Sequence, residues 1–193
     1  MVKQASFQSG VITLEEPFSK LDNLNSYSQS FTSNYSSRQS RRNHTVDSSV
    51  TECIFLQLEN LKCFEVVEHQ YESKGVIFDS CIAIEPSNPA FPPHSGVIVL
   101  MSSSRKGLLE VSFINPVNLV SAFVTSSQRL VLSAYDASRQ LLSQSILPCG
   151  NLANSDSGLA PNTLLSVSAK NIHFVSFHAF DGQFTVDDLS FCY

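Results

Sequence analysis

The sequence predicts an all-β sandwich for residues 51–193, and three observations predict it. From Cys53 onward, short runs rich in Val, Ile, Leu and Phe alternate with clusters of Ser, Asn, Pro and Gly at roughly 8–12-residue spacing. Within the runs apolar and polar residues alternate, as in Leu109-Glu110-Val111-Ser112-Phe113, which is the pattern of a half-buried strand. No segment shows a helical stripe of useful length.

The expected strands follow from these runs, and neighbouring short strands can merge. Asn115-Pro116 and the proline-rich stretch 86–93 are expected to be turns or loops. Leu109, Val111 and Phe113 should face the core together. In chain order, we expect strands near residues 53–58, 64–69, 75–79, 81–85, 96–101, 108–114, 117–125, 129–136, 140–147, 163–168, 171–180 and 183–191.

Residues 1–50 have a different composition. They hold twelve Ser, three Thr, four Asn and four Gln, with apolar residues scattered singly. Such a segment cannot bury enough apolar surface to offset chain entropy, so we expect a disordered arm. Its basic cluster at 37–42 is interpreted as a solvated charge run, with contact to a membrane or an acidic partner as the alternative.

Charge and hydropathy exclude two classes of partner. Residues 51–193 hold seven basic and thirteen acidic residues, a net charge of −6. A domain this acidic repels phosphate backbones, so we expect no nucleic-acid binding. No segment approaches the ~20 apolar residues of a membrane span.

The five cysteines, an odd number, allow at most two disulfides, and most are expected to be small buried hydrophobic residues. No C-x-x-C spacing supports a zinc site. The cysteines leave the redox compartment undecided.

Four separated pieces resemble one family, the galactose-binding-like jelly-roll modules of the bacterial and cyanobacterial carbohydrate-binding type. The pieces cover residues 53–193 in the family's order. They are Leu58-Glu59-Asn60-Leu61 followed by Gln70-Tyr71 and Gly75-Val76-Ile77-Phe78; His94-Ser95-Gly96; 109–117 followed by Leu132-Ser133-Ala134-Tyr135-Asp136-Ala137; and the ending 181–191. The resemblance implies a jelly-roll sandwich that acts as a non-catalytic binding module.

The chain departs from the family pattern at two loops. Lys62-Cys63-Phe64 replaces the usual Pro and Gly after Leu61. Ser138-Arg139 stands where the family usually has a Gly, after the Tyr135-Asp136-Ala137 element. Gly or Asn is normally preferred where φ is positive, so we expect this hairpin to be built differently.

Glu59 and Asp187 are the carboxylates that we expect to matter. The resemblance implies that the first and last strands lie close together, and that these carboxylates, with loop carbonyls, hold a structural calcium ion. Calcium accepts six to eight hard oxygen ligands in loose geometry. Asp188 is a further candidate ligand, because a bulge can turn either aspartate inward. The alternative is that the carboxylates cap loops or face water.

For ligand binding, the sequence offers Tyr135 and Asp136, a ring beside an acid, although the chain has no Trp. The alternative is that this element packs a strand end, as the resemblance to the family implies. Without a G-x-S-x-G elbow or a clustered His/Asp/Ser signature, we expect no enzymatic activity. The predicted partner is a glycan, in recognition or adhesion. The alternative is a protein, bound by a scaffold module that the arm tethers. The resemblance suggests export, whereas the N-terminus as written shows no signal peptide and suggests the cytoplasm.

Overall fold

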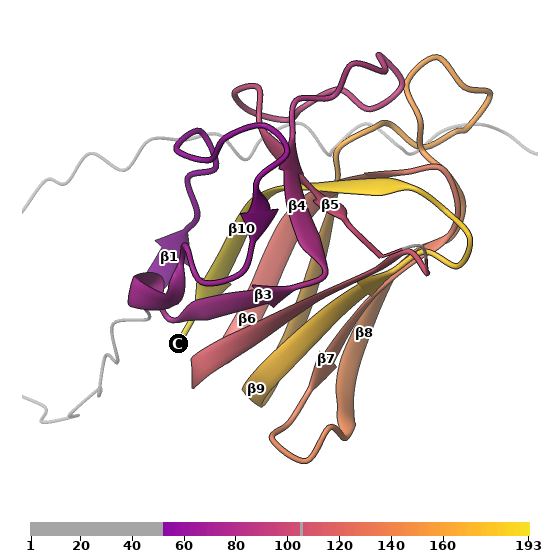
Figure 1. The fold of residues 1–193 in the computed structure, drawn as a ribbon. Coiled ribbons are helices and arrows are strands. Elements are labelled where there is room, and N and C mark those ends of the chain that lie inside the picture. Colours follow the sequence, from indigo (N-terminus) through magenta and orange to yellow (C-terminus); the bar gives the residue numbers. More distant parts are fainter. Residues whose placement is uncertain (1–51, 105) are drawn as a thin grey trace, which may run out of the picture. The chain divides into compact units, whose positions relative to one another are not determined.

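The computed structural model describes residues 52–104 and 106–193, in which antiparallel β-strands dominate (Figure 1). The predicted arm therefore lies outside the described residues. The elements are β1 (Cys53–Phe55), β2 (Val66–Val67), the 3-10 helix η1 (Glu72–Lys74), β3 (Val76–Asp79), β4 (Cys81–Ile84), β5 (Val99–Ser102), β6 (Leu108–Ser126), β7 (Leu130–Tyr135), β8 (Leu141–Leu147), β9 (Thr163–His178) and β10 (Phe184–Cys192). In this part of the chain, no helix is long and apolar enough to cross a membrane.

The strands form the two antiparallel layers of a sandwich. The first layer has the order β3–β6–β9–β7–β8. The second has the order β2–β4–β5–β10–β6–β9, and β1 pairs with the end of β10. The prediction of an all-β sandwich is confirmed.

The two layers are continuous because β6 and β9 run through both. The first part of β6 pairs with β3 and with the end of β9, whereas its second part pairs with β10 and with the start of β9. The pairing shifts between Ser112 and Val117, at Asn115-Pro116. The predicted strands 108–114 and 117–125 thus merge into β6, with a bend where we expected a turn.

The core lies between the layers, as the alternation predicts. Leu109, Val111 and Phe113 are all buried, whereas Glu110 and Ser112 between them are partly exposed. Phe113 contacts Phe191 of β10 across the sandwich, with ring centroids 5.2 Å apart. Phenylalanine side chains therefore join the two layers in a chain that has no Trp.

A disulfide joins Cys53 of β1 to Cys192 of β10. Of the other cysteines, Cys81 is buried, and Cys63 and Cys149 are exposed. The expectation that most cysteines are buried hydrophobic residues was therefore wrong, since strand pairing between the two ends of the domain brings Cys53 opposite Cys192.

Candidate functional site

The loop 94–98, called here the anchored loop, is held at one end by Asp187. The carboxylate of Asp187 lies on β10 and is only 3% exposed. Its Oδ2 accepts hydrogen bonds from the backbone N–H groups of His94 (2.7 Å) and Ser95 (3.1 Å). Its Oδ1 accepts the N–H of Asp188 at 2.8 Å. Burial raises the pKa of the Asp187 carboxyl, while the three N–H donors lower it and the Asp188 charge raises it further.

Glu59 holds the other end of the anchored loop. Its Oε1 accepts the backbone N–H groups of Val97 (2.9 Å) and Ile98 (3.1 Å). Gly96 lies between the two anchors with φ +56°, and a Cβ there would come within 2.0 Å of Glu59 Oε1. Only glycine fits this position, because both the backbone conformation and the close carboxylate exclude a side chain.

Asp188 binds the side chains of the same loop. It sits at φ +45°, in a bulge of β10 between Asp187 and Ser190. Its Oδ2 lies 2.6 Å from His94 Nδ1, and its Oδ1 accepts the Ser95 hydroxyl at 2.6 Å. The His94 ring also stacks on Phe123, with centroids 3.6 Å apart. The structure therefore brings all three predicted metal ligands to one loop.

These contacts are those of carboxylates that cap a loop. Calcium requires six to eight oxygen ligands, but the oxygens of Asp187 and Asp188 face N–H and O–H donors. In residues 52–104 and 106–193, no group of three or more His, Cys, Asp or Glu side chains is arranged to hold a metal ion. These contacts favour the loop-capping alternative, and calcium binding at the anchored loop stays a prediction.

The second candidate site is the open face, which comprises the side chains of β3, β6, β9, β7 and β8 that point away from the core. Strand register places a polar row across its centre. Glu110 of β6 is paired with Ser176 of β9, Ser176 with Ser133 of β7, and Ser133 with Gln144 of β8. The Gln144 amide donates to the Ser133 hydroxyl at 2.9 Å. The row gives the face a set of fixed hydrogen-bonding groups.

Arg139 lies over the open face from the turn between β7 and β8. Its guanidinium donates to Glu110 Oε1 at 2.6 Å, and its Cζ lies 4.4 Å from the centroid of the Phe174 ring. Asp136 builds the turn: its Oδ1 accepts the backbone N–H groups of Ser138 (2.8 Å) and Gln140 (2.9 Å). Asp136, predicted to bind ligand, thus uses this oxygen to hold the turn that positions Arg139.

Tyr135, the other predicted ligand-binding residue, lines the open face. It is paired with Phe174 of β9, one row from the polar centre. It borders a hollow of about 510 Å³ that also includes Glu110, Arg139, Gln144 and His178. Two serines and the side chains of Lys106, Leu108 and Val131 complete the lining. The tyrosine ring and the polar row therefore belong to one surface.

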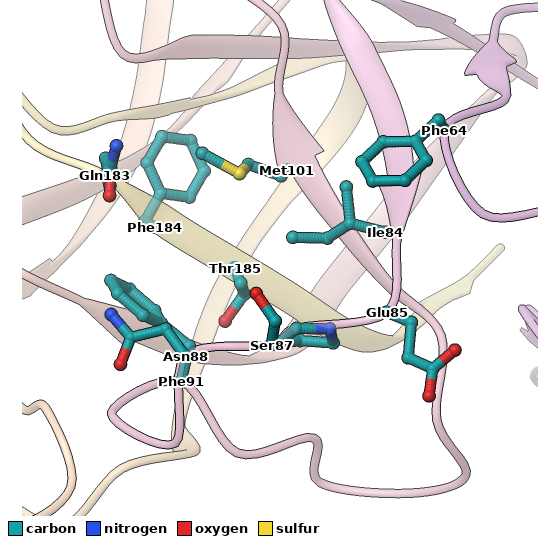
Figure 2. Close-up of a pocket in the computed structure, with 11 residues that line it drawn as sticks. Phe64, Ile84, Glu85, Ser87, Asn88, Phe91, Met101, Gln183, Phe184 and Thr185 are labelled. Atoms are coloured by element: carbon teal, nitrogen blue, oxygen red, sulfur yellow. The ribbon is translucent and has the colours of Figure 1, made fainter.

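The third candidate site is the Phe64 pocket, shown in Figure 2. It measures about 230 Å³. Aromatic and aliphatic side chains form much of its wall, and Glu85 is the only charged residue that lines it in the part of the chain that the structure describes. Its lining consists of Phe64, Ile84, Glu85, Pro86, Ser87, Asn88, Phe91, Met101, Gln183, Phe184 and Thr185.

Sequence reasoning missed Phe64 and Arg139, yet both lie at the two departures from the family pattern. Phe64 has φ +67° and Arg139 has φ +61°. In each loop the backbone keeps the left-handed conformation that favours glycine, although the side chain is large. A bulky residue in that conformation is strained by about 1–2 kcal/mol. The signal that could have found these residues was the replacement of glycine in a turn.

Comparisons with known proteins give fold-level similarity at low identity. No protein-family description matches the chain, and no curated protein matches it in sequence. A DUF4465 family protein from Bacteroides caccae superposes with a TM-score of 0.47 and 8% identity, over 72% of this chain and 98% of that one.

Two further solved structures are similar. The carbohydrate-binding module TmCBM61, in complex with β-1,4-galactotriose, gives a TM-score of 0.37 and 12% identity over 64% of this chain and 92% of that one. The arabinose-bound α-L-arabinofuranosidase MgGH51 gives 0.38 and 13% over 72% of this chain but only 26% of that one. At these values, the likeness assigns no function to the chain.

Proposed function

We propose that the protein is a non-catalytic module that binds a glycan on its open face. The observation that carries the proposal is the polar row Glu110–Ser176–Ser133–Gln144, with Arg139 held above it. A saccharide presents hydroxyl groups around an apolar ring. It therefore requires hydrogen-bonding groups in fixed positions beside an aromatic side chain.

The open face supplies both requirements. Glu110 and Arg139 are charged and hold each other in place, so each offers strong hydrogen bonds at a defined position. Gln144 is exposed, and its amide can both donate and accept, which suits sugar hydroxyls. Ser133 (4% exposed) and Ser176 (6% exposed) are buried and support the row. Tyr135 provides the ring, and Asp136 contributes by fixing the turn that carries Arg139.

Arg139→Gly tests this proposal. Glycine suits the left-handed conformation at this position, so the turn should be retained while the guanidinium is lost. On a glycan array and by calorimetry with the best glycan, we expect affinity to fall by about tenfold or more, as loss of a hydrogen bond to a charged group predicts.

Arg129→Ala is the matched control, because Arg129 is an exposed arginine outside the lining of the hollow. It should leave glycan binding unchanged. A wild-type protein that binds no glycan on the array, or equal affinities for the wild type and Arg139→Gly, would contradict the proposal.

A protein partner is the second candidate function, and edge strand β8 favours it. Leu141, Leu142 and Ile146 are exposed on this strand, which among the described strands pairs only with β7. An extended segment of a partner can add to such an edge and bury the apolar side chains. Leu142→Lys should then release a stoichiometric partner in a pull-down. Loss of glycan binding alone would reject this candidate.

A further inference from the structure

The Phe64 pocket combines aromatic rings with one acid. Phe64, Phe91 and Phe184 line it from three separate segments: the loop before β2, the loop after β4, and β10 (Figure 2). None of the ring pairs in the described chain joins two of these three phenylalanines. The three rings differ in exposure: Phe64 is 75% exposed, whereas Phe91 (8%) and Phe184 (1%) are buried, so a group that enters the pocket contacts mainly the Phe64 ring.

The electrostatics of the pocket favour a cation. Among the described residues, Glu85 lines it and no Lys, Arg or His does. Among residues 52–104 and 106–193, the Glu85 carboxylate takes part in none of the ion pairs. Aromatic rings attract cations through their electron-rich faces, so the rings and the carboxylate favour the same sign of charge. The net charge of −6 on residues 51–193 adds a long-range attraction of that sign.

The size of the pocket limits the ligand. At about 230 Å³, it is below the ~300–1,000 Å³ of sites for drug-sized molecules. The lining combines six apolar with five polar residues, a mixture that suits a cation that carries methyl groups better than a small, strongly hydrated one. A methylated ammonium group has this combination of charge and apolar surface.

Phe64 supplies an independent argument. Its ring is 75% exposed, so burial does not explain a phenylalanine at this position. The residue adopts φ +67°, and its N–H donates to Ala83 O at 2.7 Å. An exposed aromatic residue in a strained conformation gains little for folding. Strain of this kind is characteristic of binding sites.

We propose that the Phe64 pocket binds a small methylated ammonium ion, with its methyl groups against the exposed ring of Phe64 and its charge close to Glu85. This site lies apart from the open face and does not depend on the proposed glycan binding.

The test is a titration of the full-length protein with choline chloride, followed by saturation-transfer NMR and calorimetry. The comparison ligand is dimethylbutanol, the uncharged isostere in which carbon replaces nitrogen. Because the two ligands differ in charge and not in shape, we expect choline to bind saturably and the isostere to bind about tenfold more weakly.

Two variants locate the binding. Glu85→Gln removes the charge and keeps the shape, and should weaken choline by about fivefold or more. Phe64→Gly should weaken it by a similar factor without lowering the melting temperature, because glycine removes the backbone strain. The matched controls are Glu68→Gln, an exposed acid, and Phe180→Ala, a ring that is likewise 75% exposed. Both controls lie outside the pocket lining and should bind choline as the wild type does.

Several results would overturn the inference. They are the absence of saturable choline binding, equal binding of the isostere, or a Glu85→Gln variant with unchanged affinity. Displacement of choline by a neutral oligosaccharide would instead assign the pocket to glycans. If choline binds, vesicles of phosphatidylcholine and phosphatidylglycerol identify the source. Binding of only phosphatidylcholine vesicles supports a lipid headgroup, and binding of neither supports a free ligand.

Discussion

The open face and the Phe64 pocket share a backbone feature but differ in how their charged and aromatic groups are paired. Each is bordered by a large residue in the left-handed conformation, Arg139 in one and Phe64 in the other. On the open face, Arg139 forms an ion pair with Glu110 and lies over Phe174. In the Phe64 pocket, the ring is exposed and the acid, Glu85, lacks a counter-ion among the described residues.

The difference indicates where each strained residue is compensated. At Arg139, an ion pair and a cation–π contact within the folded protein offset the backbone strain energy. Phe64 has little such compensation, so a ligand is the natural source of the missing contacts. Variants that change both sites, neither site or one site alone therefore test whether Arg139 is compensated within the fold and Phe64 by a ligand.

The largest expected effect is a change in the core that the two sites share. Phe113→Ala removes a buried ring that joins the layers, and should lower the free energy of unfolding by about 3–5 kcal/mol. Urea denaturation measures it. Both glycan and choline binding should weaken, since both sites rest on this core. Unchanged stability would mean that Phe113 does not carry the interlayer contact.

Asp187→Asn should damage the anchored loop and leave the open face and the Phe64 pocket intact. In the variant, an NH₂ donor stands where a carboxylate oxygen accepts backbone N–H groups. The free energy of unfolding should therefore fall by about 1–3 kcal/mol. Melting curves with and without chelator should coincide for the wild type. A lower wild-type melting temperature in chelator, absent from Asp187→Asn, would establish the calcium site.

The same variant has a pH signature. Because the pKa of Asp187 is raised in the folded state, the folded protein binds this proton more tightly than the unfolded chain does. The contribution of this group to stability is therefore present at low pH and is lost as pH rises through the raised pKa. Stability measured from pH 3 to pH 7, about the range in which carboxyl groups titrate, should contain this falling component in the wild type. Asp187→Asn should lack it, and identical pH profiles would contradict the raised pKa.

Phe64→Gly should stabilise the protein by about 1 kcal/mol, because it removes a left-handed phenylalanine whose ring is largely exposed. Thermal and urea denaturation should agree on the sign. Stabilisation with loss of choline binding would separate function from folding at this residue. A clear destabilisation would show that the ring contributes packing that its exposure does not suggest.

Arg139→Gly should have the smallest effect on stability, within about 0.5 kcal/mol of zero. Relief of backbone strain is offset by loss of the half-exposed ion pair and of the contact with Phe174. The measurement is the change in the free energy of unfolding of Arg139→Gly compared with that of Phe64→Gly, by urea denaturation. If both variants stabilise equally, Arg139 is no better compensated than Phe64, and the contrast between the two sites is wrong.

The fold class followed from the sequence because alternation is a local property. Leu109, Val111 and Phe113 share a face in any strand, so their burial could be predicted without knowing their partners. The bend at Asn115-Pro116 could not. Whether a strand ends or passes into a second layer depends on the neighbours available on each side.

The candidate sites, like the fold, were predictable only in part from the sequence. The sequence and the family resemblance indicated Glu59, Asp187 and Asp188 as a group and Tyr135 as a surface ring. They also marked the loops at Phe64 and Arg139, where glycine is replaced. The contacts of these residues followed only from the folded arrangement of the chain. It turned the carboxylates toward backbone N–H groups, and it brought Phe64, Phe91 and Phe184 from distant segments to one pocket. Hydrogen-bond partners and cavity walls are long-range contacts, which chain folding assembles and local sequence patterns do not encode.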